Sequence, residues 1–188
     1  AWQLVKELDE ALDLPAAASF KHVSPAGAAV GIPLDEDLKE IYGTGKDKLT
    51  PLACAYLRAR GADPLCSFGD FIALSREVDR ETALLIRKLV SDGIIAPSYT
   101  NEAKEILKEK KKGAFIILLA DGNEPLSEDS EYREVHGTVF RQQRNSIKIS
   151  KENLLGNIVT ENQDLSEDAC RDLVLASIAI KYTQSNSV

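Results

Sequence analysis

The chain has 188 residues, 44% of them hydrophobic and 28% charged, which is the composition of a folded globular domain with a sizeable core. Its net charge of −7 argues against a general nucleic-acid binder and against binding to anionic membranes, but is compatible with a local cationic pocket for a phosphorylated ligand. No apolar stretch approaches the roughly 18–20 residues that span a bilayer, and no signal peptide opens the chain. These features predict a cytosolic protein that binds neither nucleic acid nor membrane.

The spacing of apolar residues predicts an alternation of helices and strands. Trp2, Val5, Leu8 and Leu12 recur at helical spacing and predict an amphipathic helix that ends near Pro15. We then expect, in chain order, a buried strand over 15–20, a Gly/Pro loop over 24–27, an acidic helix over 35–42, a helix over 50–60, a strand over 67–75, a helix over 79–90, a strand over 93–97, a charged helix over 101–112 and a strand over 113–120.

The last third of the chain is less regular. The acidic segment 121–130 is expected to be a surface loop, and Val135, Gly137 and Val139 predict an edge strand or a hairpin arm. A final helix that begins at Ser166 or Asp168 carries mostly small or apolar residues and is expected to be deeply buried. The whole pattern predicts a single α/β domain over 1–188, a three-layer α/β/α sandwich whose central mixed sheet is covered by helices on both faces.

Lys21 and His22 stand side by side where the first predicted strand runs out into a loop. An amine and an imidazole can move protons or stabilise charge near neutral pH, and the chain has only two histidines. In a regular strand neighbouring side chains face opposite ways, so the two residues can share a site only if the backbone is irregular there. A Lys–His dipeptide taken alone is more often structural than catalytic.

Other polar positions have local explanations. The lysines at 110–112 complement the dipole at a helix C-terminus, and His136 is expected at the surface. Asp92 precedes Gly93, so a turn explains it as well as contact with a ligand does. The cysteines are odd in number and far apart, which suits buried thiols in a reducing compartment, and no Cys/His pattern predicts a zinc site; they are Cys54, Cys66 and Cys170.

Several longer segments resemble one enzyme family, in the family's order and over essentially the whole chain. The chain resembles the transformylase half of the bifunctional enzymes AICAR transformylase/IMP cyclohydrolase, which act in purine biosynthesis, most weakly between Glu102 and Asp164. The matching segments are Lys-His-Val-Ser-Pro-Ala-Gly-Ala-Ala-Val-Gly at 21–31, Ala-Arg-Gly-Ala-Asp at 59–63, Ser-Phe-Gly-Asp-Phe at 67–71, Val-Ser-Asp-Gly-Ile-Ile-Ala-Pro at 90–97 and Lys-Tyr-Thr-Gln-Ser-Asn-Ser-Val at 181–188.

The resemblance implies a cytidine-deaminase-like fold without the zinc of the deaminases. It also implies catalytic roles for Lys21 and His22, and an AICAR nucleotide held by His22, Gly69, Asp92 and Asn186. A potassium ion in the family implies possible oxygen ligands near the end of the chain, where cross-strand hydrogen bonds between hydroxyls are an equal explanation. These possible ligands are Ile180, Thr183, Ser185 and Ser187.

The implied reaction is formyl transfer from 10-formyltetrahydrofolate to the 5-amino group of AICAR in a homodimer. Compared with the family, the cyclohydrolase half and a second transformylase subdomain are absent from this chain, so it is expected to supply one subdomain and to be inactive alone. Two alternatives remain open: a deaminase-like hydrolase of the same fold, and a binding or dimerisation module without turnover.

Overall fold

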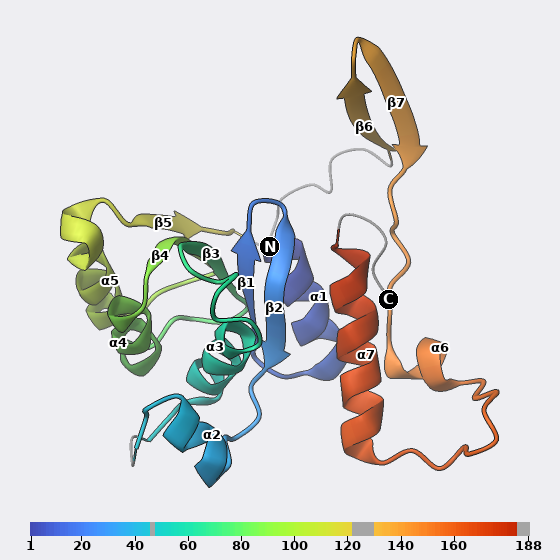
Figure 1. Ribbon diagram of the computed structural model, residues 1–188, viewed down its shortest axis with the longest axis horizontal. Coiled ribbons are helices and arrows are strands. Elements are labelled where there is room, and N and C mark those ends of the chain that lie inside the picture. Colours follow the sequence, from blue (N-terminus) through green and yellow to red (C-terminus); the bar gives the residue numbers. More distant parts are fainter. Residues whose placement is uncertain (46–47, 122–129, 184–188) are drawn as a thin grey trace.

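The computed structural model describes residues 1–45, 48–121 and 130–183. A five-stranded sheet in the order β2-β1-β3-β4-β5 forms its centre, with helices on both faces (Figure 1). β1 (Ala16–Lys21) pairs antiparallel with β2 (Ser24–Val30) and with β3 (Asp70–Leu74), whereas β3, β4 (Ser91–Ala96) and β5 (Ile116–Leu119) are parallel. The sheet is therefore mixed, and the predicted α/β sandwich is confirmed.

Local sequence signals account for most of the helices. α3 begins after Thr50, whose hydroxyl accepts the amide of Ala53, and has Pro51 in its first turn, where a missing N–H costs nothing. The helices of the sandwich are α1 (Trp2–Leu12), α2 (Glu36–Ile41), α3 (Pro51–Gly61), α4 (Arg80–Lys88), α5 (Asn101–Lys108) and α7 (Glu167–Lys181).

The sheet divides the core into two parts. On one face α3, α4 and α5 bury a cluster that includes Tyr56, Ile72 and Ile94, and on the other α1 and α7 bury Leu8 and Val174. The close fit of α3 on β2 depends on Gly27, because a Cβ there would lie 2.0 Å from the carbonyl oxygen of Ala59. A backbone this close to a helix leaves no room for any side chain.

The segment after Lys21 differs from the prediction. Residues 24–27, expected as a loop, begin the edge strand β2, which pairs with β1 from Ala16↔Val30 to Lys21↔Ser24. The chain therefore reverses within the two residues His22 and Val23 rather than in the Gly/Pro segment. An edge strand tolerates Pro25, since its missing N–H need not join the ladder.

Three further predictions were wrong. α7 buries only one face, because Leu173 and Ile180 are exposed while Val174 is fully buried. The charged helix predicted to reach Lys112 ends at Lys108 and gives way to the short 3₁₀ turn η1 (Lys110–Gly113). Cys66, expected to be buried, is exposed.

The region 130–155 forms an arm and a short helix beside the sandwich (Figure 1). The predicted hairpin is confirmed as a separate two-stranded sheet of β6 (Ser130–Val135) and β7 (Thr138–Gln143), with an exposed His136 in its turn. α6 (Lys151–Leu155) was not predicted. Across residues 1–45, 48–121 and 130–183, no helix is both long enough and apolar enough to cross a membrane.

Candidate functional site

Lys21 is the last residue of β1 and is held by the loop that precedes β3. Its ammonium donates to the carbonyl oxygens of Phe68 at 2.7 Å and Gly69 at 3.1 Å. A lysine ammonium has three N–H donors, so these two hydrogen bonds fix its position and leave one donor for a ligand.

His22 opens the two-residue turn between β1 and β2 and has a left-handed backbone, with φ of 56°. Its side chain is exposed and makes no hydrogen bond to the described part of the chain. A non-glycine residue in this conformation carries strain of about 1–3 kcal/mol, which is common where a site is preorganised. The irregular backbone that Lys21 and His22 need in order to share a site is therefore present.

Gly69 brings the predicted site residues together. Its φ of 73° lies in the left-handed region, and a Cβ built on it would lie 3.1 Å from Nζ of Lys21 and 3.8 Å from Oδ2 of Asp92. Gly69 and Asp92 follow Lys21 by about 50 and 70 residues along the chain. The three segments thus meet at one point, at the end of the sheet where β1 ends and β3 and β4 begin.

Asp92 is the second residue of β4 rather than part of a turn, so the turn explanation offered for it was wrong. Its side chain is 56% exposed, and Oδ1 accepts a hydrogen bond from Nζ of Lys111 at 2.7 Å. This hydrogen bond lowers the pKa of Asp92 below its ordinary value, and the positive charge of Lys21 lowers it further. The carboxylate therefore stands ionised between two ammonium groups.

The three consecutive lysines have three different environments. Lys110 is buried, donates to the carbonyl oxygen of Leu89 and stacks over the ring of Phe115, and burial lowers the pKa of Lys110. Lys111 points to Asp92, and Lys112 is exposed. Lys110 is thus structural, but it contacts the C-cap of α4 and not the end of its own helix, as was predicted for this basic segment.

A buried polar network supports the loop under Lys21. Asp70, which is fully buried, forms an ion pair with Arg60 at 3.0 Å and accepts a hydrogen bond from the hydroxyl of Ser19 at 2.6 Å. Arg60 also donates to the carbonyl oxygens of Ser67 and Val90. Burial raises the pKa of Asp70, and the hydrogen bond from Ser19 and the charge of Arg60 oppose that rise.

Sequence reasoning did not predict the contacts that Lys111, Arg60 and Asp70 make. Asp70 gave one usable signal, since it is a charged residue directly before the apolar run at 71–74. Arg60 gave none, because Arg58 and Asp63 make its segment charged. Lys111 gave no such signal, because its role depends on a left-handed backbone that nothing in a run of lysines predicts.

The end of α7 is tied to α1. Glu7 accepts hydrogen bonds from the ammonium of Lys181, at 3.0 Å and 2.9 Å, and from the hydroxyl of Tyr182 at 2.6 Å. These contacts hold the residues that lead into the Thr-Gln-Ser-Asn-Ser segment. Figure 1 shows this end of α7 on the same side of the molecule as the turn between β1 and β2.

The predicted potassium ligands fall only partly in the described residues. The hydroxyl of Thr183 donates to the carbonyl oxygen of Ile180 at 2.7 Å, and that carbonyl also accepts the amides of Tyr182 and Thr183. Thr183 keeps oxygen lone pairs for a cation, whereas the carbonyl of Ile180 is already occupied, so this set fits a potassium ion only in part. Ser185, Asn186 and Ser187 lie outside the described residues.

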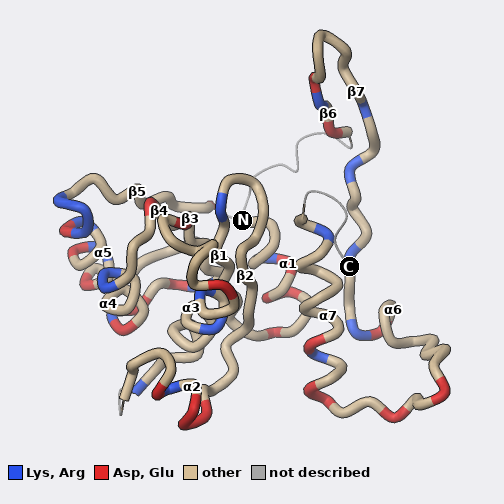
Figure 2. The backbone as a smooth tube through the Cα atoms, in the orientation of Figure 1, with Lys and Arg blue, Asp and Glu red and all other residues tan. Residues whose placement is uncertain are grey.

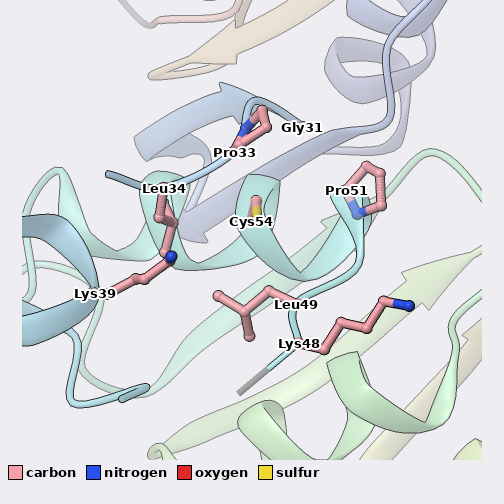
Figure 3. Close-up of a pocket in the computed structure, with 8 residues that line it drawn as sticks. All are labelled: Gly31, Pro33, Leu34, Lys39, Lys48, Leu49, Pro51 and Cys54. Atoms are coloured by element: carbon pink, nitrogen blue, oxygen red, sulfur yellow. The ribbon is translucent and has the colours of Figure 1, made fainter. Parts of the chain in front are cut away.

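A cavity of about 280 Å³ lies elsewhere, between α2 and α3 (Figure 3). Gly31, at its wall, follows the end of β2 that is farther from His22. Lys39 at its rim is paired with Glu36 at 2.7 Å. The cavity is therefore separate from the site formed by Lys21, Gly69 and Asp92. Within the described ranges, no group of three His, Cys, Asp or Glu side chains is arranged to hold a metal ion.

Comparison with known proteins adds independent findings. The model of the AICARFT/IMPCHase bienzyme family matches residues 1–188. The curated relatives include the bifunctional purine biosynthesis protein PurH of Bacillus cytotoxicus, 29% identical over 188 residues, and those of Bacillus cereus AH187 and Bacillus thuringiensis Al Hakam, each 30% identical. Each match covers 100% of this chain and 32% of the relative, so the chain spans about a third of their length.

Proposed function

Because the chain belongs to the AICARFT/IMPCHase bienzyme family, we propose that it is the first transformylase subdomain of a homodimeric enzyme of purine biosynthesis. The reaction is transfer of a formyl group from 10-formyltetrahydrofolate to the 5-amino group of the AICAR nucleotide. The observation that carries the proposal is the meeting of Lys21, Gly69 and Asp92 at one edge of the sheet. These residues come from three separate motifs, and a chance match of motifs would not bring them together.

The chemistry needs a base and an oxyanion partner. The amine nitrogen attacks the formyl carbon, the formyl oxygen becomes negatively charged, and the amine loses a proton. The carbonyl then re-forms as the bond from the formyl carbon to the folate nitrogen breaks, and that nitrogen takes up a proton. The amine is a poor nucleophile, since its lone pair is delocalised into the imidazole and carboxamide, so deprotonation must accompany attack. His22, exposed at the tip of its turn, acts as the general base.

Lys21 stabilises the oxyanion. Two of its N–H groups are held by the carbonyls of Phe68 and Gly69, which leaves the third to donate to the developing negative charge. The same ammonium lies in position to return a proton to the folate nitrogen. A donor that is already oriented reorganises little during the reaction, and for this reason such groups contribute strongly to the rate.

The nucleotide is held beside this pair. The Oδ2 atom of Asp92 faces Gly69, where an ionised carboxylate accepts hydrogen bonds from hydroxyl groups of a ligand, and the missing side chain at Gly69 leaves room for it. Asn186 orients the carboxamide or formyl oxygen. If potassium binds near Thr183, the hydroxyl oxygen of Thr183 would be one of its ligands, and the ion would supply a positive charge there.

The decisive experiment compares variants of the full-length protein in an assay of formyl transfer from 10-formyltetrahydrofolate. Lys21→Ala and His22→Ala are each expected to lower kcat by about 10²–10⁴-fold, the usual contribution of an oxyanion donor or a general base. Thermal unfolding and dimerisation should change little, because His22 is exposed and Lys21 is partly exposed.

The other histidine provides a matched control. His136 also opens a two-residue hairpin turn, with φ of 50°, and is also exposed. His136→Ala should therefore keep wild-type turnover. Unchanged transfer in Lys21→Ala and His22→Ala would refute the assignment and favour a binding or dimerisation module instead.

A further inference from the structure

Lys111 has a conformation that ordinary helix termination does not explain. α5 ends at Lys108, and Lys111, Lys112 and Gly113 then follow with φ of 53°, 56° and 88°, a short left-handed turn. This turn directs the side chain of Lys111 back across the start of β4 to Oδ1 of Asp92 at 2.7 Å. The basic segment is visible between α5 and β5 in Figure 2, within a chain whose net charge is −7.

The ion pair does not offset the unfavourable backbone conformation of Lys111. The side chains of Lys111 and Asp92 are 43% and 56% exposed, and an ion pair this exposed contributes little to stability. The left-handed region is unfavourable for a residue other than glycine, and two consecutive lysines adopt it here. The arrangement therefore lowers stability on balance, as strained residues at functional sites do.

The geometry at Asp92 shows what the contact achieves. Lys111 occupies Oδ1, while Oδ2 faces Gly69, and the charge of Lys21 acts on the same carboxylate. With one oxygen held, the carboxylate cannot rotate freely, and its second oxygen stays directed into the candidate site. A fixed acceptor loses less conformational entropy when a ligand binds than a free one does.

We propose that Lys111 is a positioning residue, which holds Asp92 so that Oδ2 accepts a hydroxyl group of the ribonucleotide. This inference rests on the proposed function, because it takes the nucleotide to be the ligand of Asp92. Lys111 does not touch the reacting atoms, so it governs nucleotide binding rather than the formyl-transfer step.

The test compares Lys111→Met, Lys111→Arg and Lys112→Met in the full-length protein. Lys112 is a matched control, since it has the same side chain and the same left-handed backbone but no ion pair with any described residue. Lys111→Met should raise KM for AICAR about fivefold, the equivalent of roughly 1 kcal/mol, with kcat within about twofold of wild type. Lys111→Arg should restore KM, and Lys112→Met should leave it unchanged.

A further variant confirms that Lys111 acts through Asp92. In an Asp92→Asn background, Lys111→Met should add less than about twofold to KM, because the positioned charge is already gone. Equal KM values for Lys111→Met and wild type would overturn the inference. An equal rise in Lys111→Met and Lys112→Met would also overturn it, since that result points to general attraction of an anion.

AICAR binding and formyl transfer are measured separately, so a wrong role for Lys111 is distinguished from a wrong proposed function. Calorimetric titration with AICAR gives the same comparison as a dissociation constant and needs no formyl transfer. Wild-type protein that binds AICAR without transferring formyl would refute the proposed function and leave the Lys111 comparison intact. Wild-type protein that does not bind AICAR would overturn the positioning role of Lys111.

Discussion

Replacement of Arg60 by methionine tests how the loop under Lys21 is held. The Arg60 side chain is 9% exposed and pairs with Asp70, whose side chain is 0% exposed. Methionine retains much of the length and volume of arginine but removes the charge and all five donors. The variant therefore leaves a carboxylate buried without its cation. It also removes one hydrogen bond from each of the carbonyl oxygens of Ser67 and Val90, which still accept the amides of Asp70 and Gly69.

The expected loss of stability has two components. Removing one partner of a buried ion pair costs about 3–5 kcal/mol, which is a large share of the roughly 5–15 kcal/mol that stabilises a domain. The lost hydrogen bonds to Ser67 and Val90 contribute part of this at every pH, about 1 kcal/mol each. The remainder arises from the charge on Asp70 and depends on pH.

The sign of the pH dependence follows from the pKa of Asp70. Burial already raises this pKa above its ordinary value in the folded protein, and loss of Arg60 should raise it further. Between the unfolded and folded pKa values the folded state binds more protons, so stability falls as pH rises through that window. The destabilisation of Arg60→Met should accordingly be largest at neutral pH and smaller at about pH 5.

Urea unfolding of the chain, followed by circular dichroism at both pH values, measures these quantities. Arg60→Met with Asp70→Asn should be more stable at neutral pH than Arg60→Met alone, and its own free energy of unfolding should lack the pH dependence that Asp70 causes. Asp92→Asn, at an exposed position, should stay within about 0.5 kcal/mol of wild type. An Arg60→Met variant that loses under 1 kcal/mol, or loses the same amount at both pH values, would refute this reasoning.

Three further predictions concern the site and its surroundings. Gly69→Ala should cost about 1 kcal/mol in thermal unfolding and reduce kcat of the full-length protein by at least tenfold, because the new Cβ would lie 3.1 Å from Nζ of Lys21. Since Lys111 is the main cause of the lowered pKa of Asp92, Lys111→Met should move the acidic loss of AICAR binding, measured calorimetrically, to higher pH. Iodoacetamide should label the exposed Cys66 before the two buried cysteines, which mass spectrometry of the folded chain would detect. The hydrogen bond to Asp63 raises the thiol pKa of Cys66, so its labelling should be slower than that of free cysteine.

Local structure was largely predictable because local signals produce it. The apolar spacing of Trp2 to Leu12, the Thr50-Pro51 start of α3 and the apolar run before Lys21 each act within a few residues. Such signals also led to the α/β alternation and to the Lys21–His22 pair as a candidate site. The Gly/Pro segment 24–27 misled, because the pairing of β2 with β1 overrides local turn preference.

The sequence by itself determined the order of helices and strands, the family and the identity of the candidate catalytic pair, since these depend on residue type and spacing. Only the tertiary structure decided that Lys21, Gly69 and Asp92 meet, because the antiparallel pairing of β1 with β3 brings the end of one strand beside the beginnings of two others. It also decided that Asp70 is neutralised by Arg60 and that Lys111 reaches Asp92. Those contacts join residues 10 and 19 positions apart, and their partners are chosen by chain topology and backbone conformation, which no local pattern encodes.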